Sequence, residues 1–205
     1  MKTADTDKEM TSDAPSSMRA DARRNVDALL EAARSVFTES GVDTPIRTIA
    51  AKAGVGVGTV YRHFPQRSDL IKAIIQREVA AQVEAAETLS KNHKTGEALA
   101  LWMSRLIEFV GTKRGLGPAL HSGDPAYQSL PDFVLGQLTP ALHRLLKAAA
   151  ISGDVRDDVD ANDLLNAGLR LATPTNDGDT AQAKRMIALL VDGLRYSPSG
   201  TSGEV

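Results

Sequence analysis

Between residues 46 and 64, two short amphipathic segments are joined by a glycine-centred turn, and no other feature constrains the fold of this chain as strongly. The first segment carries apolar residues at spacings of three and four and ends before Gly54, whose missing Cβ permits the left-handed backbone of a tight turn. The second predicted helix runs from about Val57 to Phe64 and stops at Pro65. Two short helices meeting at such a turn predict a helix-turn-helix.

The side chains of this segment suit the packing of that motif. Ala50 is small where the two helices cross, and Ile49, Val60 and Phe64 are placed to bury against a longer preceding helix. The other side of the second helix has no obvious place in so small a core. We therefore expect it to face a binding partner; its residues are Val57, Gly58, Thr59, Tyr61, Arg62 and His63.

The rest of the chain shows helical periodicity and no strand-like alternation, so the predicted fold class is all-α. A first helix is expected from near Arg19 to a glycine C-cap at Gly41. Thr44 is a candidate N-cap for the short helix that follows, and Ser68 for a long fourth helix. Later helices are predicted at about 95–110, 125–152, 161–172 and 180–195.

Four segments follow from this pattern. Residues 1–18 lack periodicity and are expected to be a disordered arm, and residues 197–205 a disordered, Ser/Gly-rich tail. Residues 19–66 form the predicted helix-turn-helix domain. Residues 67–196 form a second helical domain, joined to the first through the long fourth helix.

The net charge of −2 hides an uneven distribution. Residues 19–77 hold 10 lysines and arginines against 6 acidic residues, a net charge of +4, so the remainder carries −6. A basic N-terminal block indicates that this part faces a polyanion such as DNA. The chain also lacks cysteine, any apolar run of roughly 20 residues and an apolar N-terminal leader. We therefore expect a soluble, cytoplasmic protein without membrane contact.

No residue pattern predicts catalysis. The histidines after residue 90 form no compact metal-ligand motif, and no nucleophile elbow is present. The repeat Gly54-x-Gly56-x-Gly58 has the wrong spacing for a nucleotide loop and follows no predicted strand. We expect neither an enzyme nor a bound metal or cofactor.

The helix-turn-helix segment resembles the DNA-binding region of the tetracycline-repressor (TetR) family. The match covers about Arg23 to Ile75, with one departure at Gly56, where the family often has a serine N-cap. The selective part of the resemblance is the run Ile49-Ala50…Ala53-Gly54-Val55…Gly58-Thr59-Val60-Tyr61-Arg62-His63-Phe64.

The resemblance implies roles for individual residues. Thr59, Tyr61 and His63 match positions that touch the DNA backbone or base edges. Arg47 matches a position that reaches a base or a phosphate. Arg67 replaces the family's usual lysine at the start of the fourth helix and is expected to clamp a phosphate.

Further DNA contacts are implied on either side of the turn. Thr44 and Thr48 lie near the start of the second helix, where hydroxyl and N–H groups suit phosphate. Val57 and Gly58 are placed to admit a thymine methyl or a close backbone approach. For Arg62, DNA contact and simple surface solvation are equally open.

In the family, such proteins bind operator DNA as homodimers, and the last two helices form the dimer interface. The residues that this implies as dimer anchors, some of which could instead fill the monomer core, are Leu164, Leu165, Leu169, Ile187, Leu190, Val191 and Leu194.

The resemblance also implies a small-molecule effector that enters the second domain, tilts the fourth helix and releases the DNA. Repression is the family default; an activator or a regulator without an effector remains open. Candidate pocket residues suggest a largely apolar or aromatic ligand, although helix packing is the alternative for several of them; they are Trp102, Leu106, Phe109, His121 and Phe133.

Overall fold

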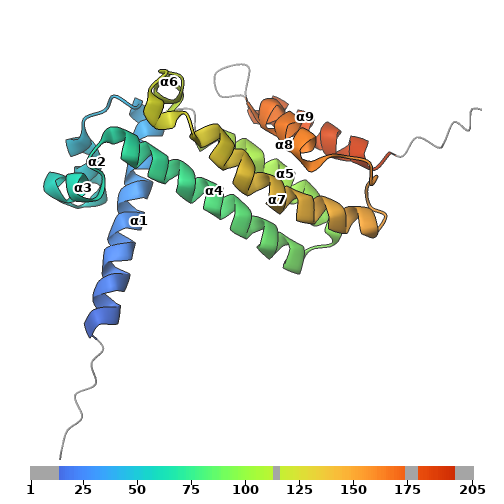
Figure 1. Cartoon of the computed structure of the whole chain (residues 1–205), viewed down its shortest axis with the longest axis horizontal. Helices are drawn as coiled ribbons and strands as arrows, with labels where there is room; N and C mark the ends of the chain where they lie inside the picture. Colours follow the sequence, from blue (N-terminus) through green and yellow to red (C-terminus); the bar gives the residue numbers. More distant parts are fainter. Residues whose placement is uncertain (1–13, 113–115, 174–179, 197–205) are drawn as a thin grey trace, which may run out of the picture.

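The computed structural model describes residues 14–112, 116–173 and 180–196, and every regular element in those ranges is helical (Figure 1). The predicted all-α class is therefore confirmed. The predicted arm before residue 14, the predicted loop after Thr173 and the predicted tail lie outside the described residues. Within the described ranges, no helix combines the length and apolar character needed to span a membrane.

Four helices make up the N-terminal part, and their bounds are α1 Ala14–Ser40, α2 Ile46–Ala53, α3 Val57–His63 and α4 Arg67–Asn92. Helix α1 begins ahead of the expected start near Arg19, so residues 14–18 are helical rather than part of an arm. Pro15 is compatible with this start, because proline is tolerated in the first turn of a helix.

The helix ends between α1 and α4 correct two predicted caps. Gly41 ends α1 with a positive φ of 80°, as expected. Thr44 does not cap α2, because its hydroxyl donates backwards to the carbonyls of Ser40 and Gly41. Helix α4 begins one residue before Ser68, and its N-terminus is held where Asp69 Oδ2 accepts from the backbone N–H of Gln66 at 3.1 Å.

The C-terminal part comprises α5 Thr95–Thr112, α6 Gly117–Leu120, the 3-10 turn η2 Pro125–Tyr127, α7 Leu130–Ile151, α8 Ala161–Ala172 and α9 Thr180–Leu194. The helix expected over about 125–152 is therefore wrong at its start. Asp124 caps the short turn by accepting from Ala126 N at 2.8 Å. Pro131 then lies in the first turn of α7, which suits a new helix start.

Helix α5 lies at the centre of the C-terminal part, packed against α4, α7, α8 and α9. Trp102 is completely buried there, and its indole N–H donates to the carbonyl of Gln82 at 2.9 Å. Gly168 lets α8 approach α5 closely, because a Cβ at this position would lie 2.9 Å from Leu106 Cδ1 and Met103 Cε. Helices α8 and α9, orange and red in Figure 1, form an outer layer on α5.

Charged side chains fasten α1 to the middle of α4. Arg77 Nη1 donates to the carbonyl of Asp27 at 2.9 Å and lies 3.7 Å from Glu31 Oε2. Arg34 pairs with Glu31 in the same helix and lies 3.9 Å from Glu78 on α4. Helix α1, against which α2 packs, is thus tied to the long helix that continues into the C-terminal part.

Candidate nucleic-acid interface and ligand cavity

The helix-turn-helix is held together by a small apolar centre. Ile49 and Ala50 on α2 and Val60 on α3 are all buried. Gly54 adopts the left-handed conformation with φ 69°, and its N–H reaches the carbonyls of Ala50 and Ala51. Gly54 therefore makes the turn that sets α3 against α2, as the sequence predicts.

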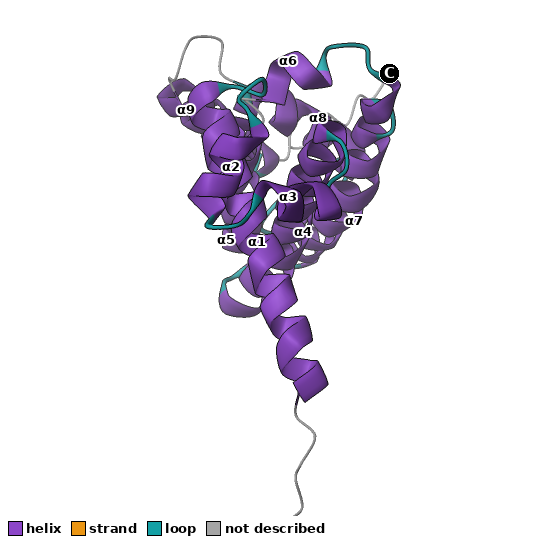
Figure 2. Cartoon of the chain, turned by 90° about the vertical axis from the view of Figure 1, so that its left-hand side faces the viewer, coloured by secondary structure: helices purple, strands orange, loops and turns teal. Residues whose placement is uncertain are grey.

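The opposite side of α3 faces solvent at one end of the molecule (Figure 2). Val57 is 40% exposed and Tyr61 is 51% exposed, although both are large apolar or aromatic side chains. Gly58, Arg62 and His63 are also exposed, and Thr59 is half-buried. A Cβ built on Gly58 would meet nothing within 4 Å, so this turn of α3 presents bare backbone to an approaching partner.

The start of α2 lies beside this surface. Arg47 and Thr48 are exposed, as a contact with DNA requires. Thr44 is half-buried, and its hydroxyl already donates to two carbonyls. Its hydroxyl could therefore serve a phosphate only by giving up these bonds.

Arg67 has a structural partner that the sequence did not predict. Its Nη1 donates to the carbonyl of Val42 and, at 2.8 Å, to that of Thr44. Its guanidinium carbon lies 6.0 Å from the centre of the Phe37 ring. Arg67 thus braces the loop between α1 and α2, and a phosphate contact would have to use its other N–H groups.

Lys52 on α2 is engaged within the protein. Its ammonium donates to Ser35 Oγ at 2.7 Å and to Glu39 Oε1 at 3.0 Å. The hydrogen bond from Ser35 and the neighbouring Lys52 lower the pKa of Glu39 below its ordinary value. Since Glu39 balances the charge of Lys52, the exposed arginines of α2 and α3 that remain are Arg47 and Arg62.

Family models match both parts of the chain. The model described as bacterial regulatory proteins, tetR family, matches residues 29–74. The model described as transcriptional regulator SbtR-like, C-terminal domain, matches residues 94–196, which is half of the chain. The chain belongs to the TetR family. It is a DNA-binding transcription regulator and not an enzyme.

Individual relatives agree with this assignment. TetR transcriptional regulator SCO0520 from Streptomyces coelicolor is 36% identical, with a TM-score of 0.71 over 85% of this chain and 99% of that one. A TetR regulatory protein from Mycobacterium vanbaalenii is 33% identical, with a TM-score of 0.71 over 87% and 99%. HTH-type transcriptional regulator SAUSA300_2515 from Staphylococcus aureus is 30% identical over 126 residues, which are 57% of this chain and 68% of the relative.

Three of the predicted effector residues of this TetR chain are packed in its core. Trp102, Leu106 and Phe109 are fully buried. Their spacing along α5 identifies a buried helix face but cannot tell a packed core from a ligand wall. Their role in effector binding stays a prediction.

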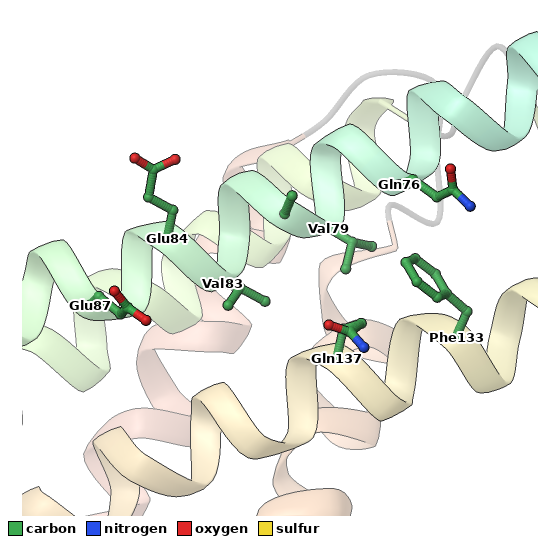
Figure 3. A pocket seen from close by; sticks show the side chains of 8 residues that line it. Gln76, Val79, Val83, Glu84, Glu87, Phe133 and Gln137 are labelled. Atoms are coloured by element: carbon green, nitrogen blue, oxygen red, sulfur yellow. The ribbon is translucent and has the colours of Figure 1, made fainter.

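The other two predicted effector residues line two different hollows. Phe133 on α7 lies over a groove of about 290 Å³ between α4 and α7, opposite Gln76 and Val79 (Figure 3). His121 lines a larger cavity of about 450 Å³ that reaches from α4 across α6, η2 and α7 to α8. The lining residues of this α4–α8 cavity are Ile75, Leu120, His121, Tyr127, Leu130, Pro131, Val134, Leu135, Asn166 and Leu169.

The predicted dimer anchors lie mainly in the chain's own core. Five are buried there, namely Leu164, Leu165, Ile187, Val191 and Leu194, and two are half-buried against it, namely Leu169 and Leu190. This face of α8 and α9 packs in the chain's own core, and a role for these residues in a dimer interface stays a prediction. A second stripe on α9 is open to solvent: Met186 is 37% exposed, Leu189 is 67% exposed, and Gly193 has free space around its Cα.

Sequence reasoning missed two groups of residues in this TetR protein. The sequence could have revealed Leu189 and Met186, because the apolar residues of α9 cover more of its circumference than one buried face needs. The sequence could hardly reveal Tyr127 and Asn166 as cavity residues, because the cavity is lined by five elements that lie far apart in the chain. Among the described residues, no cluster suited to a metal ion was found.

Proposed function

We propose that the protein is a repressor that binds a pseudo-palindromic operator as a homodimer and is released by a small molecule in the α4–α8 cavity. The observation that carries the DNA-binding part is the solvent-facing side of α3, where Val57 and Tyr61 are exposed while Val60 supports the helix from beneath. An exposed phenol and an exposed valine suit a phosphate oxygen and a thymine methyl.

A dimer is supported by the exposed stripe on α9. Leu189 and Met186 place apolar area on the outer layer, and Gly193 allows another helix to come close. A second copy of the chain is the occupant that we propose, since an operator with two half-sites about 34–36 Å apart, one turn of DNA, requires two α3 helices.

Release by a ligand is supported by the place of the α4–α8 cavity beside the start of α4. Tyr127 lines the cavity and is buried on η2, which packs against α4. Burial raises the pKa of Tyr127, and its neighbour Asp124 raises this pKa further while Arg67 lowers it. The wall of the cavity thus lies within electrostatic reach of the residue that braces the α1–α2 loop.

The DNA-binding part is tested with an operator selected from random duplexes by the wild-type protein. Tyr61→Ala should weaken operator binding at least tenfold and Tyr61→Phe less, both without loss of helical content. Ile151→Ala is the matched control, because Ile151 is also an exposed apolar residue, 79% exposed, but is the last residue of α7 in the C-terminal part. Equal affinities for all four proteins would remove Tyr61 from the interface.

The regulatory part needs two further measurements. Deletion of the gene should raise transcription from the selected operator if the protein represses, and lower it if the protein activates. A compound that stabilises the protein by occupying the α4–α8 cavity should weaken operator binding by a factor of about 5–150. Saturation without any change in operator affinity would favour a regulator that works without an effector.

A further inference from the structure

The α4–α8 cavity has mostly apolar walls. Leucine, isoleucine, valine and proline side chains supply most of its lining, from α4, α6, α7 and α8. Its lining residues include no lysine, arginine, aspartate or glutamate. A charged ligand would find no charged side chain in the lining to pair with, and burial of an unpaired charge is costly. The remaining polar side chains are those of His121, Tyr127 and Asn166.

The hydrogen bond made by His121 fixes which of its ring nitrogens can accept a further hydrogen bond. Its Nδ1 lies 2.8 Å from the carbonyl oxygen of Gly117. A carbonyl oxygen can only accept, so the proton must be on Nδ1. In the neutral imidazole, Nε2 is then unprotonated and accepts a hydrogen bond.

The side-chain amide of Asn166 also offers a hydrogen-bond acceptor. Its Nδ2 donates to the carbonyl of Asn162 at 2.9 Å, one turn earlier in α8. This bond fixes the orientation of the amide, because the carbonyl of Asn162 requires a donor. The Oδ1 atom is therefore the acceptor end that Asn166 can offer to a ligand.

We infer that the α4–α8 cavity takes a neutral, mostly apolar molecule that donates hydrogen bonds, a phenol or an alcohol, to His121 Nε2 and Asn166 Oδ1. The inference about which ligand binds does not depend on the proposed function. Only the expected release of operator DNA on binding rests on it. Two acceptors in an apolar wall are satisfied by hydroxyl donors. These two acceptors cannot donate to an ether oxygen or to a carboxylate, and they repel the charge of a carboxylate.

The test compares three probes that differ only in the polar group: 4-hexylphenol, 4-hexylanisole and 4-hexylbenzoate. Binding to the full chain is measured by calorimetry at about pH 8, where an ordinary imidazole is neutral and an ordinary phenol is protonated. The phenol should bind about 3- to 10-fold more tightly than the anisole for each hydrogen bond made, and the benzoate should bind more weakly than the phenol.

Variants locate the binding site. His121→Phe and Asn166→Leu should each remove most of the preference for phenol over anisole while leaving anisole binding nearly unchanged. His143→Phe is the matched control, because His143 lies on α7 and lines a different hollow. The control should keep the wild-type preference. A preference that survives in both cavity variants would overturn the assignment of the acceptors.

The remaining outcomes separate this inference from the proposed function. Tighter binding of the benzoate, or equal binding of phenol and anisole, would overturn the ligand class even if the compound releases operator DNA. Preferential binding of the phenol with unchanged operator affinity would support the ligand class and count against release by an effector. Binding of none of the three probes would contradict the inference.

Discussion

The guanidinium of Arg67, at the first residue of α4, donates a hydrogen bond to the carbonyl oxygen of Thr44, just before α2. The same nitrogen reaches the carbonyl of Val42. One side chain therefore joins the long helix that continues into the C-terminal part to the loop that positions the DNA-binding turn. Since a cation bonds two backbone carbonyls, the link is stronger than one between neutral groups.

Arg67→Ala should lower the free energy of unfolding by about 1.5–3 kcal/mol, because hydrogen bonds to a charged group are lost. Operator affinity should fall as well, because the α1–α2 loop loses its brace. Chemical denaturation and titration with operator DNA measure the two effects. Lys72→Ala is a suitable control, since Lys72 pairs on the surface with Asp69 in its own helix.

The salt dependence of binding decides how Arg67 acts. If it only braces the loop, the slope of log affinity against log salt should match that of the wild type. If it also clamps a phosphate, the slope should fall by roughly 0.9. Full stability together with a reduced slope would show that the bonds to Val42 and Thr44 matter little.

Leu189→Arg should give a monomer that remains folded, since Leu189 is 67% exposed and the arginine would meet its own copy across a two-fold axis. Sedimentation at several protein concentrations measures the effect, and operator binding should weaken with it. Ile151→Arg, at another exposed apolar position, should leave the dimer intact. If Leu189→Arg sediments like the wild type, the interface is elsewhere.

Glu78 and Glu31 should affect stability in opposite pH ranges. Burial raises the pKa of Glu78, so the stability it contributes is present in acid and is lost as the pH rises through its folded pKa. The hydrogen bond from Arg34 lowers the pKa of Glu31, so its contribution is present near neutrality and is lost as the pH falls.

Two glutamine variants test these opposite pH dependences of stability. At neutral pH, Glu78→Gln should be as stable as the wild type or more stable, whereas Glu31→Gln should be less stable by up to about 1 kcal/mol, as for an exposed pair. Both differences should shrink in acid. Urea unfolding at a series of pH values measures them, and a loss of stability at neutral pH in Glu78→Gln would show that its ion pairs outweigh its burial.

Tyr127→Leu should separate ligand binding from release. A leucine keeps an apolar wall in the α4–α8 cavity but removes the phenol that lies near Arg67 and Asp69. A compound bound in the cavity should then bind with similar affinity and weaken operator binding less than in the wild type. The measurement is operator affinity with and without saturating compound; an unchanged ratio would place the coupling on other residues.

Local patterns predicted the helix-turn-helix well because its determinants are local. Gly54, Ala50 and Val60 act within one short segment, and the structure gives each the expected place. The caps were less predictable: Thr44 and Ser68 are good capping residues, but bonds from Thr44 to α1 and from Asp69 to Gln66 decide the actual helix ends.

The C-terminal surfaces were predicted poorly because they depend on which helix covers which face. Periodicity identified Leu164 and Ile187 as apolar-face residues, but it could not tell that both would be buried in the chain's own core. It likewise could not separate Trp102, sealed in the core, from His121, which lines a cavity. Only the packing of α4, α7 and α8 distinguishes these cases.

Helix α4 runs unbroken for 26 residues, which makes it about 39 Å long. A rotation of only about 5° about its far end would move its first residue by about 3.4 Å, roughly the rise of one base step along a DNA strand. The bonds of Arg77 to α1 and the packing of α5 against α4 therefore limit the angle through which α4 can rotate. Reading a fixed DNA spacing requires this helix to be held within a few degrees.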